Sequence, residues 1–326
     1  MKTIVIKLPF DLEERILSFP FLHAIRNKYP EADIHFITPK FNIEVLNLLP
    51  FKAFYHEFDE DEFKTVFDVH RFCVNSKIYQ VDLFFNLTNS FSDASFGLAL
   101  KAPQRVGFSD GWKTTVLNQK TPRPRGHHVC EEFLSLYKVH TGEEADPRQK
   151  VMSREIEPHY EDWSSAPYIV IDLAPLRNAM IADEWIEFFS MIQNQKIILI
   201  ASQDQEKIQS MMSTFVGILP KHNTYISFIY KNWIELAKVL AFSRGVLAFQ
   251  GPLPSFAAYL GARTLVLYDH DDPQRTAPLY FMTDIAFMSL QEQGQPEPAK
   301  EGSLMPRQQF NMEAVFIKTM SFFRLD

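Results

Sequence analysis

Residues 233–278 read WIELAKVLAFSRGVLAFQGPLPSFAAYLGARTLVLYDHDDPQRTAP, a succession of helix, strand and turn signals. Apolar residues recur at helical spacing from Ile234 to Ala241, and Val246–Phe249 is a short apolar run typical of a buried strand. Gly251-Pro252 then breaks the chain before a second helix and a second strand. A strand that leads into a helix through a tight turn places free backbone amides at the carboxyl edge of a parallel sheet, where α/β proteins bind phosphates. The stretch therefore predicts a nucleotide-type ligand.

The alternation of strand and helix extends over the rest of the chain and predicts βαβ units with mainly parallel sheets. In the first half we expect strands at residues 3–7, 33–37, 81–87 and 105–108, and helices at 12–28, 41–48, 92–100 and 128–140. In the second half we expect strands at 168–173 and 196–201, helices at 183–192 and 203–214, and a closing helix at 312–323. Polar loops are expected at 109–126, after residue 268, and at 290–308.

The stretch 141–165 is polar and has few apolar side chains, which is typical of a linker. We therefore predict two Rossmann-like α/β domains, over residues 1–155 and 165–326. Two such domains joined by a linker place a ligand site in the cleft between them.

Composition excludes several classes of function. The net charge of −7 argues against general nucleic-acid binding, which needs a basic face. Cys73 and Cys130 lie far apart without metal-ligand spacing, so reduced thiols and no metal are expected. Lys7 and Pro9 interrupt the first apolar run, and no apolar run reaches the length of a membrane span, so we expect neither a secretory signal nor a membrane-spanning segment. We expect a cytoplasmic protein, at most peripheral to the inner face of the cytoplasmic membrane.

Four segments follow one another in an order that is shared with a known family. They are an opening helix with Tyr-Pro before the next strand, an Asp-led strand followed by Arg-x-Gly-Phe, a His-x-x-Glu helix and an Asp-Pro-x-Arg loop: Glu14–Ile34, Val81–Leu87 with Lys101–Phe108, His128–Leu136, and Asp272–Pro278. Together they resemble glycosyltransferase family 9, the ADP-heptose:lipopolysaccharide heptosyltransferases. This resemblance implies a GT-B fold, in which two Rossmann-like domains with mainly parallel sheets face a central cleft.

The resemblance also implies a metal-independent, inverting transfer without a cofactor. A heptose-like sugar moves from a nucleotide-diphosphate donor, such as ADP-heptose, to a lipopolysaccharide-core or other cell-surface glycan acceptor. The family's catalytic Asp falls on Glu14, and a glutamate can also act as a general base. Alternatively, Glu13 and Glu14 only favour the positive end of a helix that begins near Leu12.

The C-terminal domain is the one that binds the nucleotide sugar in this family. By position, the resemblance implies these donor-binding residues: Arg177, Asn178, Asp204, Gln250, Gly251, Ser255, Arg275 and Thr276. The family's Asp-(Ser/Thr)-Gly-x-x-His motif is replaced by Gln250–Ser255, which leaves donors other than ADP-heptose open. A plain helix N-terminus at Pro252, an N-cap at Asp204 and solvated or ion-paired arginines are the structural alternatives.

The N-terminal domain holds the acceptor in this family. Its candidate contacts here form a basic stretch on an acidic chain: Lys113, Lys120, Arg123, Arg125 and His128. In the family such charges meet the anionic groups of a glycolipid or glycan. They could equally face an anionic bilayer surface or form a solvated loop.

The sequence is compatible with two functions. The whole-chain resemblance favours an active heptosyltransferase-like enzyme. The altered donor motif favours a catalytically inactive relative that keeps the fold as a binding or scaffold protein.

Overall fold

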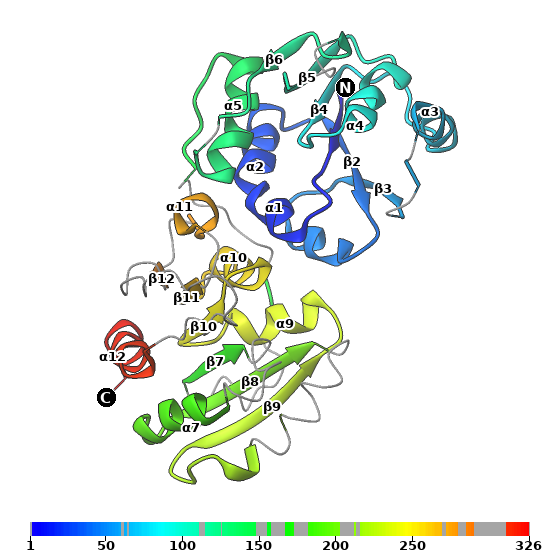
Figure 1. Cartoon of the computed structure of the whole chain (residues 1–326). Coiled ribbons are helices and arrows are strands. Elements are labelled where there is room, and N and C mark those ends of the chain that lie inside the picture. Colours follow the sequence, from blue (N-terminus) through cyan, green and yellow to red (C-terminus); the bar gives the residue numbers. More distant parts are fainter. Residues whose placement is uncertain are drawn as a thin grey trace, which may run out of the picture. The chain divides into compact units, whose positions relative to one another are not determined.

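Two six-stranded sheets organise the chain, one in each of its two units, Met1–Arg154 (unit 1) and Glu155–Asp326 (unit 2) (Figure 1). All strand pairings in both sheets are parallel. The computed structural model describes residues 2–59, 62–63, 65–110, 115–124, 126–147, 155–157, 167–172, 182–202, 212, 216–268, 272–279, 285–289 and 311–325. The predicted fold class, α/β with mainly parallel sheets, is confirmed.

The sheet of unit 1 has the strand order β3-β2-β1-β4-β5-β6. Its strands are β1 (Thr3–Lys7), β2 (Asp33–Pro39), β3 (Phe54–Phe58), β4 (Leu83–Asn86), β5 (Gln104–Phe108) and β6 (Gln119–Thr121). Its helices are α1 (Leu12–Leu17), α2 (Phe19–Lys28), the 3₁₀ helix η1 (Ile43–Leu48), α3 (Val66–Asn75), α4 (Phe91–Ala99) and α5 (Val129–Thr141). Because the sheet is parallel, the loops that follow β1 to β6 all lie at its carboxyl edge.

The helix predicted over residues 12–28 is two helices, because Pro20 cannot donate a backbone hydrogen bond inside a helix. Ser18 ends α1, and Pro20 lies in the first turn of α2, where its missing N–H costs nothing. Asp11 starts α1, since its Oδ1 accepts the Glu14 backbone N–H at 2.9 Å. This break confines Glu14 to a helix of six residues beside the sheet edge.

Phenylalanines fill much of the core of unit 1. Phe84 and Phe96 pack with Val5 and with Val69 of α3 on one face of the sheet. Phe63 stands edge-on to Phe96, with ring centroids 4.9 Å apart, a geometry that aromatic pairs prefer. These rings therefore pack α3 and α4 on the sheet.

The sheet of unit 2 has the strand order β12-β11-β10-β7-β8-β9. Its strands are β7 (Tyr168–Asp172), β8 (Lys196–Ser202), β9 (Thr224–Tyr230), β10 (Gly245–Phe249), β11 (Thr264–Tyr268) and β12 (Ile285–Ser289). Its helices are α7 (Ala182–Met191), α9 (Trp233–Leu240), α10 (Pro252–Tyr259), α11 (Pro273–Thr276) and α12 (Met312–Phe323). Trp185 and Phe188 of α7 and Phe323 of α12 belong to one buried cluster with β8 and β10.

Several elements were not predicted from the sequence. These are the strands β3, β6, β9 and β12 and the helix α3, and residues 273–276 form the short helix α11 instead of a loop. Thr65 and Asp68 form a capping box at the start of α3, so a sequence signal for this helix did exist. Most of the predicted helix 203–214 and the predicted loop 290–308 lie outside the described residues.

Candidate functional site

The first candidate site lies at the carboxyl edge of the sheet of unit 1. The chain leaves β1 at Lys7, turns through residues 8–11 and enters α1, whose first turn contains Glu14. The Glu14 side chain is 34 % exposed, so it remains reachable from solvent. A carboxylate is thus fixed on a short helix at the edge where parallel sheets bind their ligands.

Arg123, which follows β6, joins Glu14 to a second carboxylate. Its Nη2 donates to Glu14 Oε1 at 3.1 Å, and its Nε donates to Glu132 Oε2. Glu132 is almost fully buried on α5, and the guanidinium lies 5.3 Å from the ring centroid of Phe108. Only Oε1 of Glu14 is engaged among the described residues, which leaves Oε2 for an incoming group.

Burial and ionic contacts act on the Glu14 carboxyl in opposite directions. Desolvation raises its pKa above the ordinary value, and the charge and hydrogen bond of Arg123 partly offset this rise. The nearby carboxylates of Asp11 and Glu132 add to the rise. A raised pKa suits a carboxylate that must accept a proton.

Arg15, the neighbour of Glu14, is buried and fixes the loops around α1. Its guanidinium donates to three backbone carbonyls, Pro9 O at 3.3 Å, Phe10 O at 2.9 Å and Phe41 O at 2.8 Å. Burial lowers the pKa of Arg15 to about 10, against the opposing effect of Asp11 and Glu44. The loops after β1 and β2 are therefore tied together next to Glu14.

Lys7, the last residue of β1, is also buried. Its Nζ lies 3.5 Å from Asp93 Oδ1 and donates to Leu8 O at 3.3 Å. Thr88 Oγ1 donates to the other oxygen of Asp93 at 2.7 Å. Burial lowers the pKa of Lys7 to about 8, although Asp93 opposes the shift. This network follows β1 and β4, so it belongs to the same sheet edge as Glu14.

The structure separates the predicted acceptor residues. Lys120 is exposed on β6, whereas Arg123 is ion-paired with Glu14 and Glu132. His128 is buried and caps α5, since its Nδ1 accepts the backbone N–H of Cys130 at 3.1 Å. Lys113 and Arg125 lie outside the described residues.

The second candidate site lies at the β10–α10 turn of unit 2. Gln250 follows β10, and its backbone N–H donates to Leu267 O at 2.9 Å. Gly251 caps α10 at a φ of 126°, a conformation open to glycine. Ser255 is fully buried, and its Oγ has no hydrogen-bond partner among the described residues.

The neighbouring strand β11 leads to the other predicted donor residues. Arg275 and Thr276 lie on α11, which Asp272 starts by accepting the Gln274 backbone N–H at 2.9 Å. Within the described chain, the buried Oγ1 of Thr276 also has no partner. Two unsatisfied hydroxyls thus follow adjacent strands of the sheet, where ligand oxygens could complete their hydrogen bonds. Three predicted donor residues lie outside the described ranges: Arg177, Asn178 and Asp204.

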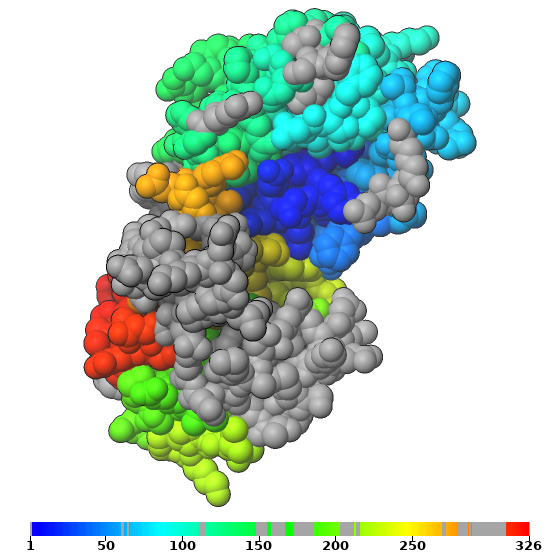
Figure 2. Space-filling view, in the orientation of Figure 1, coloured from blue at the N-terminus to red at the C-terminus, as the bar shows by residue number. Residues whose placement is uncertain are grey.

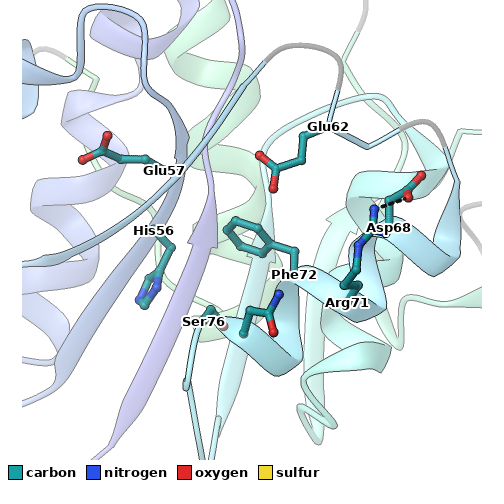
Figure 3. A pocket seen from close by; sticks show the side chains of 8 residues that line it. His56, Glu57, Glu62, Asp68, Arg71, Phe72 and Ser76 are labelled. Carbon is teal, nitrogen blue, oxygen red and sulfur yellow. Dashed lines mark hydrogen bonds and ion pairs between the residues drawn. The ribbon is translucent and has the colours of Figure 1, made fainter.

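A separate pocket of about 320 Å³ lies between β3 and α3 in unit 1 (Figure 3). Its lining includes Glu57, Glu62 and Asp68, but none of the predicted site residues. Asp68 faces Arg71 at 2.9 Å, and Glu62 accepts a backbone N–H at 3.1 Å, so these acids support local structure. Among the described residues, no group of three or more His, Cys, Asp or Glu side chains could hold a metal ion.

Comparison with known proteins identifies the family. Residues 71–306 match the family model for glycosyltransferase family 9 (heptosyltransferase). The chain belongs to this family. The resemblance inferred from the sequence is therefore confirmed, and Glu14 lies before the matched range. Among curated protein sequences, none matches.

Solved structures of this family share the fold. A family 9 glycosyltransferase from Veillonella parvula is 13 % identical with a TM-score of 0.75, and the match covers 100 % of this chain and 98 % of that one. ADP-heptose lipopolysaccharide heptosyltransferase II of E. coli is 15 % identical with a TM-score of 0.67, covering 99 % of both chains. E. coli heptosyltransferase WaaC with ADP is 11 % identical with a TM-score of 0.68, covering 88 % of this chain and 93 % of that one. The family 9 chain thus has the GT-B fold with two Rossmann-like domains.

Sequence reasoning missed the partners that hold Glu14 in place. Glu132 lies in the segment His128–Leu136, but the His-x-x-Glu motif there uses its neighbour Glu131, and the sequence patterns assigned no role at the site to Asp11. The Asp-x-x-Glu spacing at the start of α1 was an available signal for the cap. The 109-residue separation between Glu14 and Arg123 offered none.

Proposed function

We propose that this family 9 protein is an inverting, metal-independent glycosyltransferase that uses Glu14 as its general base. It transfers a heptose-like sugar from a nucleotide-diphosphate sugar to a cell-surface glycan acceptor such as the lipopolysaccharide core. One observation carries the proposal: the Glu14 carboxylate, which is partly exposed and has a raised pKa, stands at the carboxyl edge of the sheet. This is the chemistry that deprotonation of a sugar hydroxyl requires. The sequence resemblance independently assigns the family's catalytic acid to this residue.

In the proposed reaction, Glu14 Oε2 takes the proton of the acceptor hydroxyl. The hydroxyl oxygen then attacks the anomeric carbon, and the bond from that carbon to the nucleotide diphosphate breaks with its electron pair on the phosphate oxygen. Arg123 holds Oε1 at 3.1 Å, so it orients the base without covering the second oxygen. Attack from the face opposite the leaving group inverts the anomeric configuration.

Unit 2 is proposed to bind the diphosphate of the donor at the ends of β10 and β11. The unsatisfied hydroxyls of Ser255 and Thr276 would donate to phosphate or ribose oxygens, and Arg275 would supply positive charge. At this turn, Gln250 and Gly251 would let the backbone come close to the diphosphate. The proposal extends to Arg177, Asn178 and Asp204, which precede these elements in the same unit.

One observation favours a second candidate, a relative that binds without catalysis. Pro252 and Pro254 occupy the first turn of α10 and have no amide hydrogens. This turn therefore offers fewer donors to a diphosphate than an ordinary helix start. Under this alternative, no nucleotide sugar binds in unit 2.

Two measurements decide between the candidates. Calorimetric titration with ADP-heptose, ADP, UDP-sugars and GDP-sugars, without added metal, should give a micromolar Kd, about 8 kcal/mol, for one nucleotide series. With the donor identified, Glu14→Gln should abolish transfer, whereas Glu13→Gln, the matched neighbour, should keep it. If none of the nucleotides binds, the non-catalytic binding protein is favoured. If Glu14→Gln keeps full turnover, Glu14 is not the general base.

A further inference from the structure

We infer that the sugar accepting the transfer is uncharged and lies with its apolar face on Phe10 and Phe41, beside Glu14. The inference rests on the proposed function, because it concerns the acceptor of that reaction. It assigns the two phenylalanines as specificity-determining residues.

Both rings are partly exposed to solvent. Phe10 is 40 % exposed and Phe41 is 61 % exposed. Phe10 follows β1 and Phe41 follows β2, and these adjacent strands are parallel, so both residues lie at the sheet edge that contains Glu14. The blue segments near the start of the chain reach the surface in Figure 2.

Arg15 holds the two residues in fixed relation to Glu14. A single guanidinium donates to Phe10 O at 2.9 Å and to Phe41 O at 2.8 Å. Arg15 adjoins Glu14 on α1, and its own burial leaves the guanidinium little freedom to move. The backbone at the two phenylalanines is therefore fixed next to α1 before any ligand arrives, which reduces the ordering cost of binding.

The charges around Glu14 disfavour an anionic sugar. Asp11 and Glu44 lie close enough to Arg15 to raise its pKa, and they add negative charge beside the two rings. The described cations near this edge already have partners. Arg15 is bound to three carbonyls, Lys7 lies beside Asp93, and Arg123 is shared by two carboxylates. Lys40, which precedes Phe41, pairs with Asp59 at 2.7 Å.

Among the described residues, a carboxylate or phosphate on the reacting sugar would thus meet acids and only cations that already have partners, and desolvating it would be costly. An uncharged sugar has an apolar C–H face that can cover an aromatic ring. It also has hydroxyls that can donate hydrogen bonds to Glu14. The same negative charge disfavours contact with an anionic bilayer.

The test uses the full-length protein on an array of neutral oligosaccharides and oligosaccharides bearing uronate, ulosonate or phosphate at the terminal sugar. We expect capture of neutral termini. For the captured glycan, titration should show that Phe10→Ser and Phe41→Ser each weaken binding about 5-fold, the loss expected for one aromatic contact. Phe67→Ser is the control, because Phe67 is 86 % exposed on α3, after β3.

Preferential capture of acidic termini overturns the inference, and so does capture of neither class. Equal losses in Phe10→Ser and Phe67→Ser would also overturn it. The nucleotide titration is independent of this outcome. A protein that binds a nucleotide sugar but captures acidic termini refutes the inference alone, whereas capture of neutral termini without nucleotide binding refutes the transferase proposal.

Discussion

Arg123 donates to Glu14 Oε1 at 3.1 Å across 109 residues of sequence, and the same guanidinium donates to Glu132. The two carboxylates differ in environment, because Glu14 is 34 % exposed and the Glu132 side chain only 2 %. One arginine therefore serves a partly open carboxylate and a buried one. Substitution of Arg123 should therefore have two effects that can be measured separately, one on the ionisation of Glu14 and one on the stability of unit 1.

Replacing Arg123 with Met should raise the pKa of Glu14. Arg123 is the group that lowers this pKa, while burial, Asp11 and Glu132 all raise it. Titration of the Glu14 side-chain carbonyl by ¹³C NMR, assigned by its loss in Glu14→Gln, measures the shift directly. A base must be ionised to accept a proton, so the acid limb of any transfer activity should move to higher pH by the same amount. An unchanged or lower pKa contradicts the pairing.

The same substitution should destabilise unit 1 by about 3 kcal/mol, because it leaves the buried Glu132 charge without its partner. Adding Glu132→Gln removes that charge and should restore more than half of the loss. Urea unfolding followed by circular dichroism compares the single and double variants. Additive losses in the double variant would show that Arg123 and Glu132 do not interact energetically.

The sequence patterns predicted the architecture better than the site. Apolar runs such as 3–7 and 246–249 identify central strands, because strands covered on both faces by helices are continuously apolar. Edge strands lack that signature, and β3 includes the polar residues His56 and Glu57. The pairing of Glu14 with Arg123 depends on which loops the sheet order brings together, and residue spacing along one chain does not contain that information.

Lys7 should make stability depend on pH in the alkaline range. Its pKa falls from 10.5 to about 8 on folding because of burial, so between these values the unfolded chain binds the extra proton. Stability attributable to Lys7 therefore rises with pH through this window, by about 3 kcal/mol in total. Urea unfolding at pH 7 and pH 10 should show that the free energy of unfolding of wild type rises by most of this amount relative to that of Lys7→Met. Parallel pH curves for the two proteins would contradict a buried, desolvated amine.

Gly245 should tolerate no side chain, because a Cβ there would lie 2.3 Å from the ring of Phe323. Phe323 is fully buried at the end of α12, and Arg244 Nε donates to its carbonyl oxygen at 2.9 Å, so the ring has no room to retreat. Gly245→Ala should therefore cost unit 2 about 2 kcal/mol by overpacking. Gly217→Ala is the matched control, since no described residue beyond its own helix and chain neighbours lies within 4 Å of its added Cβ, and it should leave stability unchanged or slightly raised. Phe323→Leu should itself be destabilising, yet it should cost less in the Gly245→Ala background than in wild type, because the smaller side chain relieves the overlap. Thermal unfolding of the four variants measures this coupling, and wild-type stability in Gly245→Ala would show that α12 does not pack on β10.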